Sequence, residues 1–143
     1  MKTRGYDPAL VILTVDGVDI SGFADGTFVN VSRNVDAFEL SVGADGESTR
    51  AKSNNRSGKF AFTLQQTSPS NDYLNSLANS DEQSNQGVVP VQVKDAGGNS
   101  LHSAEKAWVL KKADAGYSKT TENREWVLET GNLTHNPGGN SEL

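Results

Sequence analysis

The stretch that decides the fold spans residues 64–74 and reads Leu64-Gln65-Gln66-Thr67-Ser68-Pro69-Ser70-Asn71-Asp72-Tyr73-Leu74. It joins the end of a β-type run to the start of a helix. Ser68 suits the cap of a helix whose first position is Pro69, because a proline there removes no intrahelical hydrogen bond. The sequence therefore predicts one helix over residues 69–83, with Leu74 in a short apolar stripe, directly after a strand.

The run before this helix alternates with a period of two. Residues 59–65 place bulky apolar side chains on one face of a strand and small or polar ones on the other. Residues 36–43 repeat the pattern, and we expect these two strands to pair. The small or polar side chains of the two runs are Glu39, Ser41, Ala61, Thr63 and Gln65.

Further strands are predicted over residues 9–15, 27–33, 88–94, 105–111 and 124–130. Asp16-Gly17 signals a hairpin turn after the first of them, which is apolar on both faces and is expected to be buried on both. Trp108 and Trp126 are interpreted as core or interface anchors. The predicted fold is mainly β, an antiparallel β-sandwich or flattened barrel with one α-helix.

The 143 residues predict a single domain, residues 1–143, large enough to bury its own core. Residues 44–57 form a long polar stretch without apolar periodicity. A loop of this length usually has a task, and a disordered excursion is the equal alternative. Residues 136–143 contain Pro137-Gly138-Gly139 and are predicted to be a flexible tail.

Charge and composition exclude several functional classes. The 13 Lys and Arg against 18 Asp and Glu, a net charge of −5, argue against high-affinity nucleic-acid binding. A mildly acidic wall past which DNA slides is compatible with this charge. The chain has no cysteine, and its first apolar run is too short to be a membrane-spanning segment or a secretory signal. We expect synthesis in the cytoplasm.

No residues form a recognisable catalytic, cofactor or metal site. His102 and His135 lack a second ligand at metal spacing and are interpreted as exposed strand-end or loop residues. Glu125 and Glu129 could act as a glycosidase pair only in a cleft, so a polar strand edge is the preferred interpretation. The sequence therefore predicts a protein that is not an enzyme.

Four short motifs add to the stretch at residues 64–74. They are Tyr6-Asp7-Pro8, residues 21–26, Ala107-Trp108 and Arg124-Glu125-Trp126. Together, in this order over roughly residues 5–133, they resemble the tail tube proteins of contractile-tailed bacteriophages.

This resemblance implies a structural subunit of the virion, made in the cytoplasm of the host bacterium. Six copies would form a ring, each giving four strands to a barrel, and rings would stack helically into a channel inside a contractile sheath. DNA would pass without specific binding. The implied partners are other copies of the chain, the tail sheath protein, the tape-measure protein and a baseplate or tube initiator.

The resemblance assigns two sets of residues to assembly. The small or polar strand faces suit a water-filled bore, so the channel-lining residues are Glu39, Ser41, Ala61, Thr63 and Gln65. The predicted loop would contact the next ring through Arg50, Lys52, Asn54, Asn55 and Arg56.

Two other functions remain open. The chain could be the tube subunit of a related injection machine, such as a type VI secretion system or a tailocin. It could also be a monomeric β-sandwich that binds sugar or protein, which would expose an aromatic patch.

Overall fold

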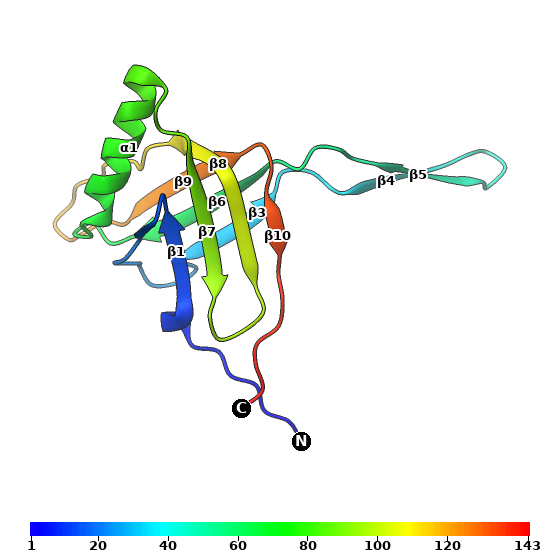
Figure 1. The fold of residues 1–143 in the computed structure, drawn as a ribbon, viewed down its shortest axis with the longest axis horizontal. Coiled ribbons are helices and arrows are strands. Elements are labelled where there is room, and N and C mark those ends of the chain that lie inside the picture. The colour runs from blue at the N-terminus through cyan, green and yellow to red at the C-terminus, as the bar shows by residue number, and fades with distance from the viewer.

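The structure is a computed structural model that describes residues 1–143. Its main body is one antiparallel sheet in the order β2-β1-β7-β8-β9-β6-β3, with β10 added beside β8 (Figure 1). A separate two-stranded sheet, β4-β5, projects from this body. The strands are β1 Val11–Val15, β2 Val18–Asp19, β3 Val29–Arg33, β4 Phe38–Val42, β5 Ser48–Lys52, β6 Gly58–Leu64, β7 Val89–Asp95, β8 Leu101–Lys111, β9 Arg124–Thr130 and β10 Thr134–Asn136. A 3-10 turn, Pro8–Leu10, precedes β1, and helix α1 spans Ser70–Ser84.

The sheet bends into two layers because β8 takes part in both. The first half of β8 pairs with β7 and β10, and its second half pairs with β9. Register shifts interrupt both ladders, between Val89 and Val91 and between Val109 and Lys111. Such irregularities let a strand turn a corner from one layer to the other. The mainly β fold with one helix is the predicted one.

The core lies between the layers and confirms the predicted face of β6. Phe60, Phe62 and Leu64 are at most 1% exposed, and the residues between them are only partly buried. Trp126 and Leu128 of β9 and Leu13 of β1 complete the centre of this core. The alternation of β6 thus placed its large side chains correctly.

Helix α1 was predicted almost to its ends. The helix begins at Ser70 with Pro69 as its N-cap, which makes no side-chain cap hydrogen bond, so the predicted cap at Ser68 is one residue too early. Ser68 Oγ still accepts a hydrogen bond from the Ser70 amide at 3.2 Å. Asn85 ends the helix in the left-handed conformation, with φ of 58°. Leu74 and Ala78 are buried beneath the helix, which lies against β8 at one end of the sheet (Figure 1).

The predicted pairing of residues 36–43 with residues 59–65 is wrong. β4 pairs instead with β5, from Phe38 opposite Lys52 to Val42 opposite Ser48, while β6 lies between β3 and β9. A tight turn makes the local pairing possible, because the Gly43 amide donates to the Glu47 carbonyl and Gly46 has φ of 89°. Alternation decides which residues share a face and says nothing about which strand is the neighbour.

Two other expectations about strands are wrong, and two short strands were not predicted. Most of the predicted loop at residues 44–57 is strand β5 and its connections, which its polar residues concealed. The prediction that the first strand is buried on both faces is wrong, because Ile12 is 41% exposed. The short strands β2 and β10 were not predicted. The turn at Asp16-Gly17 is confirmed, and both residues have positive φ.

The C-terminal tail lies alongside the turn between β7 and β8 and is hydrogen-bonded to it. The Asn99 amide donates to the Gly139 carbonyl at 2.9 Å, and the Ser141 amide donates to the Gly97 carbonyl at 3.0 Å. The Leu143 amide donates to the Thr3 carbonyl, so the two termini lie together (Figure 1). The flexibility of this tail stays a prediction.

Candidate assembly surfaces

The first surface is the outer face of the four adjacent strands β8, β9, β6 and β3. Ala61 and Thr63 point to this face, away from the core residues between them. Ala61 lies opposite Asn30 on β3 and Val127 on β9, and Thr63 lies opposite Glu125. Small and charged side chains therefore cover this part of the sheet. We define the outer face as Asn30, Ser32, Lys59, Ala61, Thr63, Glu125, Val127 and Glu129.

The charges of the outer face are partly paired. Lys59 and Glu129 are directly opposite in the ladder, with Nζ and Oε2 4.0 Å apart. Glu125, which the sequence placed on a polar strand edge, is exposed on the same face. One lysine and two glutamates leave the face mildly acidic.

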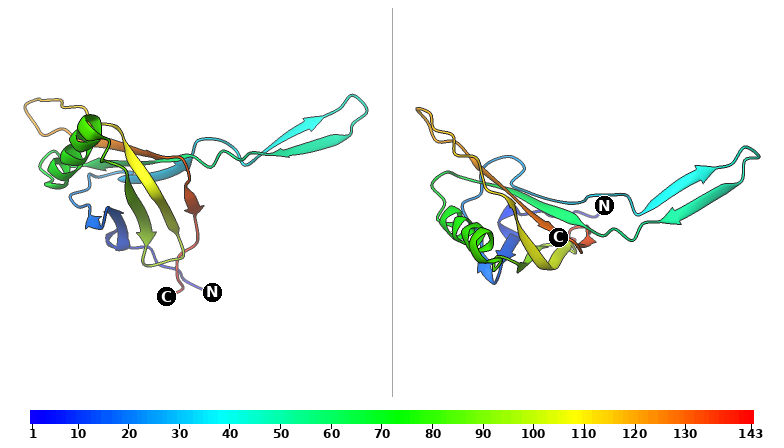
Figure 2. Two further views of the ribbon diagram at one scale, coloured as in Figure 1. Left: turned by 45° about the horizontal axis from the view of Figure 1, so that its top comes forward. Right: turned by 90° about the horizontal axis from the view of Figure 1, so that it is seen from above.

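The second surface is the β4-β5 hairpin, which extends well beyond the ends of β3 and β6 (Figure 2). All ten strand residues are exposed. One face carries Phe38, Leu40 and Val42, which are 45%, 67% and 61% exposed. An isolated two-stranded hairpin is marginally stable in water, and exposed apolar rows mark interaction sites.

Basic side chains lie along the apolar face of the hairpin. Arg50 is opposite Leu40 and Lys52 is opposite Phe38. The Arg50 guanidinium carbon lies 4.2 Å from the centroid of the Phe38 ring, a cation–π contact. The tip between the strands is acidic, with Asp45 and Glu47.

The five predicted channel-lining residues fall in two separate places. Ala61 and Thr63 lie together on the outer face, and Gln65 is exposed just past the end of β6. Glu39 and Ser41 lie on the hairpin, opposite Ala51 and Thr49. The structure therefore does not bring Glu39 and Ser41 beside Ala61 and Thr63 within one subunit.

The predicted inter-ring residues also divide. Arg50 and Lys52 are on β5, whereas Asn54, Asn55 and Arg56 lie in the connection from β5 to β6. The Arg56 carbonyl accepts a hydrogen bond from the Leu133 amide at 2.8 Å. Arg56 thus belongs to the base of the hairpin, next to the sheet.

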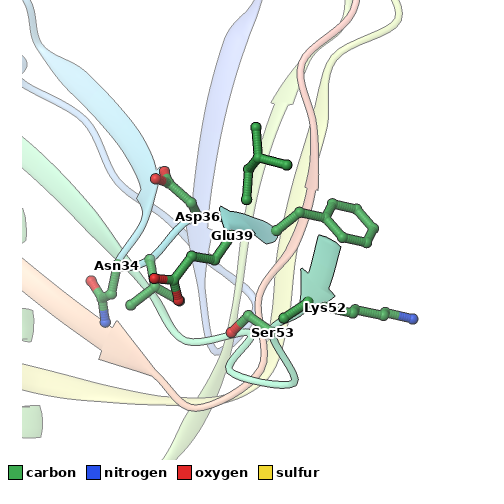
Figure 3. A pocket seen from close by; sticks show the side chains of 9 residues that line it. Asn34, Asp36, Glu39, Lys52 and Ser53 are labelled. Carbon is green, nitrogen blue, oxygen red and sulfur yellow. The ribbon is translucent and has the colours of Figure 1, made fainter. Parts of the chain in front are cut away.

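A groove lies where the hairpin leaves the sheet (Figure 3). Asn34, Asp36 and Glu39 line it from the β4 side, and Lys52 and Ser53 from the β5 side. Apolar side chains, Phe38 and Leu40 among them, form the rest of the lining. The polar part of the lining contains two carboxylates, one amine, one amide and one hydroxyl.

A second projection, which the sequence analysis did not note, lies at the opposite end of the molecule. Residues 112–123 connect β8 to β9 without regular structure beside α1 (Figure 2). Lys112 Nζ lies 3.9 Å from Glu82 Oε2 on the helix. Tyr117 is 78% exposed, with the Arg124 guanidinium 5.4 Å from its ring. The available signal was a twelve-residue gap between two predicted strands.

The interpretation of the histidines as exposed is wrong, although His102 does lie near a strand end, as the second residue of β8. His102 on β8 and His135 on β10 are directly opposite each other and half-buried, with ring centroids 4.6 Å apart. Burial lowers the pKa of both imidazoles. No group of three or more His, Asp or Glu side chains is arranged to hold a metal ion. No helix has the length and apolar character needed to cross a membrane.

Similarity to known proteins extends over nearly the whole chain. The family model described as "Bacteriophage PhiTE tail tube protein" matches residues 13–138. The chain is 32% identical over 150 residues to "Structural protein ORF10" of Pseudomonas phage KPP10, covering 99% of this chain and 87% of that protein.

Solved structures share the fold at low sequence identity. The sheath/tube terminator of an extracellular contractile injection system, PVC, has a TM-score of 0.66 at 12% identity, covering 94% of this chain and 99% of that chain. The tube terminating cap of the anti-feeding prophage has a TM-score of 0.62 at 8% identity, covering 92% of this chain and 91% of that chain. These likenesses show the fold. The match over residues 13–138 and the phage relative show the family: the chain belongs to the bacteriophage PhiTE tail tube protein family.

Proposed function

We propose that the chain is the repeating subunit of a phage tail tube, forming hexameric rings that stack helically into a hollow channel. The observation that carries this proposal is the β4-β5 hairpin. Its three apolar side chains project into solvent on a hairpin with no other element of the chain beside it. A neighbouring copy that covers them would remove this apolar surface from water. We propose that the hairpin contacts the next ring.

Within a ring, the outer face would form the wall of the bore. The strands β8, β9, β6 and β3 are the four adjacent strands that each subunit would contribute. β3 is the free edge of the sheet, and Trp108–Lys111 of β8 pairs with β9 alone. Two edges without a strand partner on opposite sides of one wall, the one on β8 lying beside α1, support continuous pairing around a ring, as edge strands readily add a further strand.

The channel-lining role of Ala61, Thr63 and Gln65 stays a proposal on this basis. Glu39 and Ser41 would reach the bore only if the hairpin extends the wall of the neighbouring ring. The inter-ring role of Arg50 and Lys52 rests on their place on the hairpin's apolar face. Asn54, Asn55 and Arg56 would act at its base.

The remaining parts of the proposal come from the family. The tube would lie inside a contractile sheath in the virion tail, contact the tape-measure protein and start from a baseplate initiator. DNA would pass without specific binding, which the acidic outer face supports by repelling phosphate. The role is structural and not enzymatic, and the subunits would be made in the host cytoplasm.

Negative-stain electron microscopy of the purified protein tests this proposal. We expect rings or hollow tubes, and size-exclusion chromatography should show assemblies larger than a monomer. A protein that stays monomeric at high concentration would contradict the proposal and favour the alternative of a β-sandwich binding module. A tube subunit of a related injection machine would also assemble, so recovery of the chain from purified phage tails separates these two functions.

A further inference from the structure

All buried side-chain nitrogen or oxygen atoms that lack a hydrogen-bond partner belong to three residues. They are Nε of Arg33 and the Nδ1 atoms of His102 and His135. The Arg33 Nη2 donates to the Leu133 carbonyl at 2.8 Å, two residues before His135. The three unpartnered atoms therefore lie at one junction, between β3, β8 and β10. Such groups are rare in native structures and call for an explanation.

The two imidazoles form a side-chain contact between β10 and β8. This strand has only three residues, and its ladder is with β8, where His135 is directly opposite His102. The ring centroids lie 4.6 Å apart, and the ring planes are tilted by 34°. The ring contact adds to this short ladder and to the backbone hydrogen bonds on either side of β10, which join Leu133 to Arg56 and Gly139 to Asn99.

This contact requires neutral imidazoles. Burial lowers the pKa of His102, and the neighbouring His135 adds to this effect. Burial likewise lowers the pKa of His135, and the Arg33 guanidinium adds to it. A lowered histidine pKa means that the unfolded segment binds protons more readily, so the contact is stable above the ordinary value of 6.5 and weakens as the pH falls below it.

The other charged group beside the pair is Asp95, and the pKa of both imidazoles is lowered in its presence. Asp95 lines the same cavity of about 550 Å³ as the two histidines, together with the neutral Tyr6. Its carboxylate oxygens already accept hydrogen bonds from the Gly97 amide at 3.0 Å and from Asn140 Nδ2 at 2.9 Å. From β7, the residue opposite His102 is the uncharged Val93.

The segment that leads into β10 also holds the base of the hairpin. The Leu133 amide donates to the Arg56 carbonyl at 2.8 Å, and Asn132 bridges to Arg56. Leu133 is fully buried against Gly58, where an added Cβ would lie 2.4 Å from the Leu133 side chain. Displacement of β10 would therefore also remove support from residues 56–58.

We propose that His102 and His135 form an acid-sensitive latch, which holds β10 and the base of the β4-β5 hairpin against the sheet when neutral and releases them when protonated. The latch is a property of the single subunit and does not depend on the proposed assembly. Its effect is to couple proton uptake at the C-terminal strand to the freedom of the projecting hairpin.

Hydrogen exchange as a function of pH tests the latch. The chain has only two histidines, and these are its only side chains with an ordinary pKa between about pH 5 and pH 8. We expect the protection factors of residues 53–57 and 131–136 to fall by roughly tenfold between about pH 7.5 and pH 5. Amides of α1 serve as the internal control and should keep their protection. Equal protection at both pH values would overturn the proposal.

Two variants make the test specific. The double variant His102→Phe and His135→Phe keeps two aromatic rings without a proton site, and it should lose the pH dependence; the same fall in protection as in wild type would refute the latch. Arg33→Gln removes a charge that lowers the pKa of His135 and should therefore make the fall in protection smaller. If the double variant does not fold, NMR titration of the two wild-type imidazoles decides. Their protonation must coincide with the loss of amide protection, and protonation with protection unchanged would exclude the latch.

Discussion

The Trp126 indole Nε1 donates a hydrogen bond to Asn71 Oδ1 at 2.9 Å, joining the centre of β9 to the first turn of α1. Asn71 Nδ2 in turn donates to the Gln65 carbonyl at 3.0 Å. One amide side chain therefore ties the strand that follows the 112–123 connection to the junction between β6 and the helix. The short distance between β6 and α1 along the chain is what places Asn71 above the indole.

Removing this amide should cost stability. Asn71→Ala leaves the indole N–H without its partner, and we expect the free energy of unfolding to fall by about 1–3 kcal/mol. The matched control is Asn75→Ala, one turn further along α1 and exposed, which should change little. Thermal or denaturant unfolding measures both. Equal effects of the two substitutions would contradict the role of Asn71.

The core assignment of β6 predicts a larger effect. Phe62→Ala should lower the free energy of unfolding by about 3–5 kcal/mol, because this ring is 1% exposed and its removal leaves a cavity. Phe38→Ala is the matched control, since Phe38 is 45% exposed on the hairpin. Urea unfolding of both variants checks the difference. A Phe38 variant that is as unstable as the Phe62 variant would show that the hairpin folds back onto the core.

The two faces of the hairpin should differ in assembly. Leu40→Gln places a polar group in the apolar row and should abolish long tubes while the subunit stays folded. The control Thr49→Gln introduces a glutamine on the opposite face of the hairpin and should leave tube formation intact. Electron microscopy at matched concentration gives the number and length of tubes. Tubes of normal length from the Leu40 variant would rule out docking through the apolar face.

Salt should weaken polymerisation more than folding. Arg50 and Lys52 are exposed on the hairpin, and ion pairs that they form with a neighbouring copy would be screened over about 8 Å at physiological ionic strength. Arg50→Gln and Lys52→Gln together should make the critical concentration for assembly less sensitive to salt. Light scattering across a salt series measures this sensitivity, and unchanged salt dependence in the double variant would contradict a role for these charges.

We expect the ionisation of Tyr73 to lower the free energy of unfolding at alkaline pH. Its hydroxyl donates to the Val15 carbonyl at 3.2 Å, and burial, helped by the nearby Asp16, raises its pKa above 10.0. The neutral phenol is therefore favoured in the folded state, and its contribution is lost as the pH rises above about 10. Tyr73→Phe should cost about 1 kcal/mol at neutral pH and flatten this alkaline loss. Thermal unfolding from neutral pH to pH 11 compares the two proteins.

The sequence by itself determined the elements that depend on local patterns of residues. The alternation in β6, the helix that follows it and the turn at Asp16-Gly17 were predicted correctly, because each depends on residues close together along the chain. The fold class followed from the same local signals. The residues of the outer face on β6, Ala61 and Thr63, were found for the same reason.

Only the tertiary structure decided which strands are neighbours. β4 carries the same alternation as β6, yet Leu40 is 67% exposed and Phe62 is buried. Period-two alternation reports that one face of a strand is apolar, and an apolar face can be covered by its own subunit or by another. The contact between His102 and His135 could not be predicted from the sequence either. The 32 residues between them include all of β9, and only then does β10 pair with β8. Contacts between residues so distant depend on the path of the whole chain, and no local pattern records that path.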